Sequence, residues 1–466
     1  MTQGLVLALL LPLIIGYESF GIFRAPFVFD DYTHIFYASK WSWYTVVSEF
    51  GPVQQKPGLF YRPLGFFLYW LSYLWAGNVP WRWHGISIAL HIGNTYLVYA
   101  LCRKLRLIRP ASLGAAMLFG INGCATEAIA WIDARFDLIA TGLTLATLIF
   151  VCQYLESGRR ARLAAGLIAA LCAVLSKESA FCLPLLLLSL VPFFQAKPQR
   201  ARIRVAWQSI SGLCCAVFVY RWWAVGGIGG YAVSRIAVSE LILHRLNALS
   251  VREWAILFFP INWSTPVSSA TRAVAAILPA ILVFSAFAGR LPRRQYIACL
   301  GFIVAAALPA QKMLLIGVDL SGTRALYLPS VGLAVVWGLL FNQARSRQRT
   351  LLVCSFLVAN SVLLEHNLEA WRTIPVMAAS VCKSFGEAIA RTPGSALVQG
   401  LPATEAGVVF LANGFPECVQ MNSGVDRERV EVGNESRRSG PRRDVRVFVW
   451  NDARHGLQEI TSGTLR

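Results

Sequence analysis

The sequence predicts an all-α polytopic membrane protein, with about eleven transmembrane helices, outer interfacial helices and a small α/β carboxy-terminal appendage. The chain of 466 residues is 56% hydrophobic, and its mean hydropathy is +0.54. Only 14% of its residues are charged, whereas soluble domains carry about 25%. The formal net charge is +19, but the basic residues stand in short clusters between apolar segments. That pattern is typical of cytoplasmic loops and not of a nucleic-acid surface, so we expect no nucleic-acid partner.

Five basic clusters set the expected topology, at residues 103–109, 159–162, 197–204, 290–294 and 345–349. If all five face the cytoplasm, an even number of crossings must join each consecutive pair. At roughly 20 apolar residues per crossing, this condition selects eleven spans. They are residues 4–23, 83–102, 111–125, 136–154, 163–176, 180–194, 205–224, 272–288, 297–317, 325–341 and 350–364. We therefore expect an internal amino terminus, with an uncleaved first span, and an external tail.

Two apolar segments remain outside this count. Pro63–Ala76 is short and rich in aromatic residues, and residues 241–263 include His244, Arg245, Arg252 and Glu253. Both suit helices that lie flat at the outer membrane surface. The alternative counts them as spans, and it breaks the charge parity.

The composition changes from about residue 365 onward. A helical pattern continues to Ile389, and residues 396–399, 407–411 and 445–450 read as short strands between turns. We expect a transmembrane domain over residues 1–366 and a small extracytoplasmic domain over residues 367–466. Cys382 and Cys418 lie in this polar tail, where a disulfide is one option. The other nine cysteines lie in or beside apolar segments, where we expect them to be small buried hydrophobes.

Ionisable side chains gather at the outer ends of the expected spans. They are Asp30, Asp31, His34, Arg62, Glu127, Asp133, Arg135, Asp137, Lys177, Glu178, Asp319 and Arg324. Such groups near lipid depth are usually paired or line a wet cavity. Their mixed signs favour chemistry between an acid–base group and an anion.

The pair Asp30-Asp31 follows the first apolar segment and is flanked by aromatic residues. Two neighbouring carboxylates raise one another's pKa, so one of them can act as a base near neutral pH. A helix cap or surface turn explains the pair equally well. His84 and His91 lie seven residues apart on one helical face, and we expect them to be packed helix contacts rather than metal ligands.

Lys177 and Glu178 interrupt two apolar runs. We expect Lys177 to bind a phosphate while Glu178 orients it or binds sugar hydroxyls; the alternative is an ordinary ion pair. Arg324 and Arg62 stand at outer helix ends, where a guanidinium either binds phosphate or snorkels to the interface.

In chain order, these motifs resemble a known family. The motifs are the acidic pair, Tyr61-Arg62-Pro63-Leu64, His84 with His91, Thr126-Glu127-Ala128-Ile129-Ala130 followed by Arg135 and Asp137, Lys177-Glu178, Arg324-Ala325-Leu326-Tyr327-Leu328-Pro329-Ser330, and Trp371-Arg372. The set resembles the transmembrane O-mannosyltransferases that carry lumenal tetratricopeptide repeats, and their bacterial relatives in the GT-C superfamily. The likeness runs from about Phe29 to Arg372.

The resemblance implies a GT-C-like fold and the inverting transfer of a sugar from a polyprenyl-phosphate donor to an acceptor hydroxyl on the extracytoplasmic face. It implies Asp30 as the catalytic base, and we expect Asp31 to orient it. The donor phosphate would rest on Lys177, Arg324 and Arg135. Other substrate contacts would come from Glu178, Glu127, Arg62, Tyr327 and Asp137. We expect no metal or other cofactor, because fixed cations can stabilise the leaving phosphate; a divalent ion on Asp30 and Asp31 is the alternative.

Two departures leave the sugar and the acceptor (protein or glycan) open. Gly123-Cys124 stands where the family has His-Pro, and the tail is too short for a repeat array. Two other functions compete: a flippase or exporter of lipid-linked saccharide, and a polysaccharide polymerase or ligase. Arginine exceeds lysine and no retrieval sequence ends the chain, so we expect a bacterial inner membrane with a periplasmic site.

Overall fold

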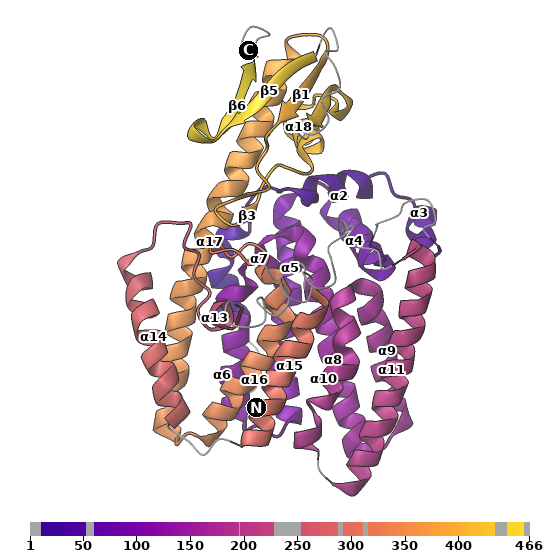
Figure 1. Ribbon diagram of the computed structural model, residues 1–466, viewed down its shortest axis with the longest axis vertical. Helices are drawn as coiled ribbons and strands as arrows, with labels where there is room; N and C mark the ends of the chain where they lie inside the picture. The colour runs from indigo at the N-terminus through magenta and orange to yellow at the C-terminus, as the bar shows by residue number, and fades with distance from the viewer. Residues whose placement is uncertain are drawn as a thin grey trace, which may run out of the picture.

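The computed structural model describes residues 11–52, 60–194, 196–227, 253–287, 292–310, 316–433 and 445–460. Long helices lie side by side in a bundle, and a small domain containing a sheet projects from one end of it (Figure 1).

Within the described residues, five helices are long and apolar enough to cross a membrane. They are α5 (Pro80–Lys104), the stretch Ile132–Ser157 that contains α8 (Arg135–Ser157), α11 (Lys197–Val225), the stretch Thr323–Gln343 that contains α16 (Tyr327–Gln343), and α17 (Ser346–Ala390). The bent pair formed by α6 (Arg109–Gly120) and the stretch Gly123–Ala130, which contains α7 (Thr126–Ala130), would make a sixth. The chain is therefore a multi-pass membrane protein, as its composition predicts.

The other expected spans also contain helix. Residues 11–18 are helical, and four further helices cover the remaining segments: α9 (Arg160–Ser176), α10 (Leu183–Leu188), α14 (Ser269–Phe287) and α15 (Arg293–Ala307). Short 3-10 turns, η4 (Glu178–Cys182) and η5 (Val191–Phe193), flank α10. Each of the eleven segments thus holds helix in its described part.

Short helices gather at the end of the bundle that carries the small domain (Figure 1). They include α2 (Asp30–Ala38), α3 (Trp43–Ser48) and α4 (Pro63–Ala76). The bounds of α4 are those expected, because Pro63 is pre-organised for the first helical position. Leu74 and Trp75 on α4 are exposed, as suits an interfacial helix. Of the second expected interfacial helix, residues 241–252 lie outside the described residues, and α13 (Glu253–Phe258) packs Leu257 into the core.

The small domain is built around the far end of α17. This helix has 45 residues, so it is about 68 Å long, roughly twice the thickness of a bilayer core. It is continuous through position 366, so the domain boundary expected there falls inside a helix and stays a prediction. One continuous helix therefore links the bundle to the sheet.

The sheet confirms the α/β appendage. Its strand order is β4-β1-β5-β6. β1 (Ser395–Gln399) runs parallel to β4 (Val430–Gly433) and β5 (Val445–Asn451), whereas β6 (Gly456–Ile460) is antiparallel to β5. The expected strand at 407–411 is reduced to β3 (Val408–Val409), paired with β2 (Thr404–Glu405). The sequence did not predict β2, β4, β6 or the helix α18 (Phe415–Ser423).

A disulfide and a shared core attach this domain to the bundle. Cys382 of α17 and Cys418 of α18 form a disulfide, with their Cα atoms 5.8 Å apart. Phe410 and Phe415 belong to the same buried cluster as Tyr32 and other α2 residues. The domain is therefore packed directly on α2, where the acidic pair lies.

Candidate active site

The helix α2 begins at Asp30, directly after a residue with an unfavourable backbone conformation. Phe29 has φ 48° and ψ −121°, and such a conformation in a non-glycine residue costs about 1–3 kcal/mol. Its N–H donates to the carbonyl of Phe410, at 3.1 Å. Contacts from the small domain thus help to hold the backbone that leads into Asp30.

Asp31 anchors the backbone around it. The residue is 1% exposed, and its carboxylate accepts from the N–H of Asp133 at 2.9 Å and from the N–H of Val28 at 3.2 Å. It therefore plays the turn-capping role that we left as an alternative, and it joins the start of α2 to η3 (Ile132–Ala134).

Asp30 is less buried, and the side chain of Asn413 donates a hydrogen bond to it. Burial raises the pKa of Asp30 to about 6, and the charge of Asp133 adds to the effect, although His34, Asn413 and Arg324 oppose it. The charge that raises the pKa thus belongs to Asp133 rather than to the neighbouring Asp31 that we expected. A carboxylate with this pKa is ionised yet basic near neutral pH.

His34 lies one turn after Asp30 on α2 and pairs with Asp133, with 2.5 Å between Nδ1 and Oδ1. Burial alone would lower the pKa of His34, but the charge of Asp133 and this hydrogen bond outweigh it and raise the pKa to about 9. His34 therefore carries a positive charge at neutral pH, close to the carboxylate of Asp30.

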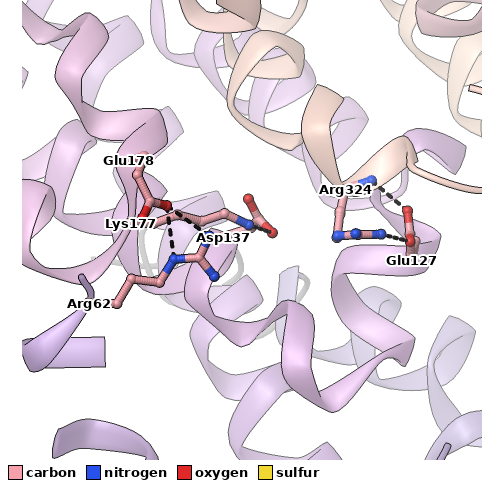
Figure 2. Close-up of polar contacts among 6 residues, drawn as sticks. All are labelled: Arg62, Glu127, Asp137, Lys177, Glu178 and Arg324. Atoms are coloured by element: carbon pink, nitrogen blue, oxygen red, sulfur yellow. Dashed lines mark hydrogen bonds and ion pairs between the residues drawn. The ribbon is translucent and has the colours of Figure 1, made fainter. Parts of the chain in front are cut away.

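Lys177 and Glu178 do not pair with each other. Lys177 is extended, with φ −160° and ψ 148°, and in extended backbone successive side chains point in opposite directions. Lys177 pairs with Asp137, whereas Glu178 accepts from Arg62 at 2.9 Å and from Arg221 at 3.3 Å. Figure 2 shows the Lys177–Asp137 and Arg62–Glu178 pairs close together as one group.

Arg324 forms a second group with Glu127. Its guanidinium and its backbone N–H, the latter at 2.9 Å, both donate to the Glu127 carboxylate. The guanidinium also lies over the ring of Trp131, at 4.4 Å. The Lys177 side chain reaches from the first group toward the second (Figure 2), and its charge interacts with that of Arg324. The two cations expected to hold the donor phosphate therefore lie in one electrostatic cluster.

The structure does not bring Arg135 and Tyr327 into this cluster as accessible groups. Arg135 is 1% exposed, donates to the Trp83 carbonyl at 2.9 Å, and lies over the Trp83 ring. The hydroxyl of Tyr327, which is 0% exposed, is 2.7 Å from Nδ1 of His91. Both support helix packing in this structure.

The histidines expected to be helix contacts are confirmed as such. Besides its bond to Tyr327, His91 lies 2.9 Å from the Gly120 carbonyl, and Nε2 of His84 lies 3.1 Å from the Ala25 carbonyl. In the described part of the chain, no three His, Cys, Asp or Glu side chains are grouped closely enough to hold a metal ion.

Sequence reasoning missed two members of the site. Arg221 is a lone cation among Tyr220, Trp222 and Trp223 at the outer end of an apolar helix, a pattern that could have identified it. Asn413 lies in a polar loop 383 residues from Asp30, and nothing local distinguishes it.

Comparison with known proteins bears on this arrangement. No family model matches the chain. It is 30% identical to the protein O-mannosyltransferase Tmtc1 of Drosophila melanogaster over 169 residues, which is 36% of this chain and 20% of that protein. The chain resembles protein O-mannosyltransferases.

Other protein O-mannosyltransferases match this chain over shorter stretches. Tmtc2 of Drosophila melanogaster is 35% identical over 127 residues, covering 26% of this chain and 14% of that protein. The protein O-mannosyltransferase tmtc2 of Xenopus laevis is 32% identical over 112 residues, or 24% and 12%. The chain thus spans at most a fifth of the length of these relatives. Among solved structures, ArnT from Cupriavidus metallidurans bound to undecaprenyl phosphate aligns over 97% of this chain and 94% of its own, with 13% identity and a TM-score of 0.39.

Proposed function

We propose that this protein transfers a sugar from a polyprenyl-phosphate donor to an acceptor hydroxyl on the extracytoplasmic face, with inversion at the anomeric carbon. One observation carries the proposal: Asp30, with a pKa raised to about 6, lies at the same end of the bundle as the charge cluster of Lys177 and Arg324. The partial similarity to O-mannosyltransferases supports it.

The proposed reaction uses Asp30 as the general base. Asp30 accepts the proton of the acceptor hydroxyl, and the oxygen attacks C1 of the sugar. The bond from C1 to the phosphate oxygen breaks, and the polyprenyl phosphate leaves with the bonding electrons. Attack opposite to the leaving group inverts C1.

Lys177 and Arg324 then stabilise the negative charge that develops on the leaving phosphate. Their carboxylate partners, Asp137 and Glu127, hold the two cations in place before the donor arrives, so little reorganisation is needed. Arg62, held by Glu178, adds a third paired cation to the same cluster. Arg135, expected to hold the donor phosphate, and Tyr327, expected to contact the substrate, have no role in this reaction because both side chains are buried.

We further propose that the site faces the periplasm of a bacterial inner membrane. α5 begins at Pro80, close to α4, and its last turn carries Arg103 and Lys104, about 38 Å away along the helix. Basic residues mark cytoplasmic helix ends, so the opposite end, with Asp30, is extracytoplasmic.

The test uses purified protein in liposomes with polyprenyl phosphates that each carry one radiolabelled hexose or pentose, and a membrane extract as the source of acceptors. We expect release of free polyprenyl phosphate and labelling of an acceptor by wild-type protein, and neither by Asp30→Asn. Movement of an intact donor across the bilayer, independent of Asp30, would identify a flippase instead. Growth of the acceptor by a preformed chain would identify a polymerase or ligase.

A further inference from the structure

The small domain touches the peptide around Asp30 at neighbouring points. The loop that joins β3 to α18 supplies the Phe410 carbonyl for the N–H of Phe29, and the side chain of Asn413 for Asp30. The next residue, Gly414, has φ 72°, and a Cβ atom built there would lie 2.2 Å from the Phe29 carbonyl oxygen. Only glycine permits this close approach.

We infer that Asn413 is a positioning residue for Asp30, and that the carboxy-terminal domain is therefore a working part of the active site. The inference rests on the proposed function. The amide N–H of Asn413 donates to Oδ1 of Asp30, which fixes the rotamer of the carboxylate. The other oxygen then faces the acceptor hydroxyl in a defined direction.

The domain controls the backbone of the base as well as its side chain. Phe29 keeps its unfavourable conformation only while its surroundings enforce it. Phe410 and Gly414 contact the N–H and the carbonyl of Phe29 respectively. Because Asp30 follows Phe29 directly, these contacts set the direction in which α2 presents it.

Several restraints keep Asn413 in place. The disulfide between Cys382 and Cys418 ties the first turn of α18 to α17. On the other side of α18, Arg427 pairs with buried Glu417 at 2.7 Å and donates to the hydroxyl of Tyr37, near the end of α2, at 3.1 Å. The helix that directly follows Asn413 is thus tied both to α17 and to α2.

The test compares the pH profiles of kcat/KM for Asn413→Ala and wild-type protein. The Asn413 amide lowers the pKa of Asp30, so its removal moves the acid limb to higher pH. We expect kcat at pH 7 to fall about tenfold, as for the loss of one hydrogen bond to a charged group, while the KM for the donor is unchanged. Asn413→Asp places a second negative charge beside Asp30 and should move the acid limb to still higher pH.

Asn422→Ala is the matched control. Asn422 belongs to the same domain and donates to the Tyr32 hydroxyl of α2 at 3.4 Å, but it does not contact Asp30. This variant loosens the same interface, and we expect its acid limb to stay at the wild-type position. If Asn413→Ala also leaves the limb in place, Asn413 has only a structural role and the inference is overturned.

A double-mutant cycle on thermal unfolding needs no activity. At pH 8 we expect Asp30→Ala and Asn413→Ala, each of which removes the hydrogen bond between the two side chains, to be non-additive, and additivity would overturn the inference. An inactive wild-type protein with a non-additive cycle would instead refute the proposed function while leaving the Asn413–Asp30 contact established.

Discussion

Replacement of Asp30 by asparagine should abolish transfer and at the same time stabilise the folded protein at neutral pH. Asparagine keeps the shape of the carboxyl group, and its amide oxygen can still accept from Asn413. The pKa of Asp30 rises from 3.8 to about 6 on folding, a change of roughly two units. At about 1.4 kcal/mol per unit, the ionised carboxylate costs the folded state at most ~3 kcal/mol, less for its partial exposure.

The direction of the pH dependence of stability follows from proton binding by Asp30. The folded protein holds the proton of Asp30 more tightly than the unfolded chain does, so stability falls as pH rises from about 4 to about 6. Above that window wild type lacks this stabilisation, whereas Asp30→Asn has no proton to lose. The variant should therefore unfold at a higher temperature than wild type at pH 8, and the difference should shrink toward pH 4.5.

The assay is thermal unfolding of the purified proteins in detergent between pH 4.5 and pH 8, at one heating rate because membrane proteins often unfold irreversibly. Glu387→Gln, which removes an exposed carboxylate from α17, is the control for the loss of one negative charge. If the variant is no more stable than wild type at pH 8, the conclusion that burial raises the pKa of Asp30 is wrong. Full transfer activity would refute its role as base.

Three further predictions concern the rest of the site. The kcat/KM of wild type should rise with pH through about 6, where Asp30 loses its proton; a flat profile down to pH 5 would argue against this base. Lys177→Met should lower kcat/KM for the donor about a hundredfold. It should also destabilise the protein, because it leaves the Asp137 carboxylate without its partner. Adding Asp137→Asn removes that carboxylate and should restore thermal stability but not activity. Serine at both Cys382 and Cys418 should destabilise the small domain by about 3–4 kcal/mol, from the loop entropy of a bridge spanning 36 residues, and should lower transfer; unchanged unfolding would contradict the first effect.

The helical bundle could be predicted from the sequence because a bilayer imposes simple rules. Long apolar runs predict where helices lie, and the bounds of α4 follow from its proline. Ionisable residues at span ends predicted the location of the candidate site, since charge near lipid needs partners or water.

The pairing within the site could not be predicted in this way. Lys177 and Glu178 are neighbours in sequence, yet the extended backbone sends them to different partners. The charge that raises the pKa of Asp30 comes from Asp133, brought there by tertiary folding. Its hydrogen-bond donor, Asn413, lies in another domain. Such partners depend on three-dimensional packing and leave no local pattern.

The unbroken course of α17 restricts how the small domain can move relative to the bundle. A domain on a flexible linker can rotate away from its neighbour. The small domain instead continues a helix whose first half packs among the other helices of the bundle. The only proline within that helix, Pro375, is buried, and it removes one backbone hydrogen bond where a bend could start. In the proposed reaction, a bulky acceptor would therefore reach Asp30 from the side of the small domain, or only when α17 tilts as a whole.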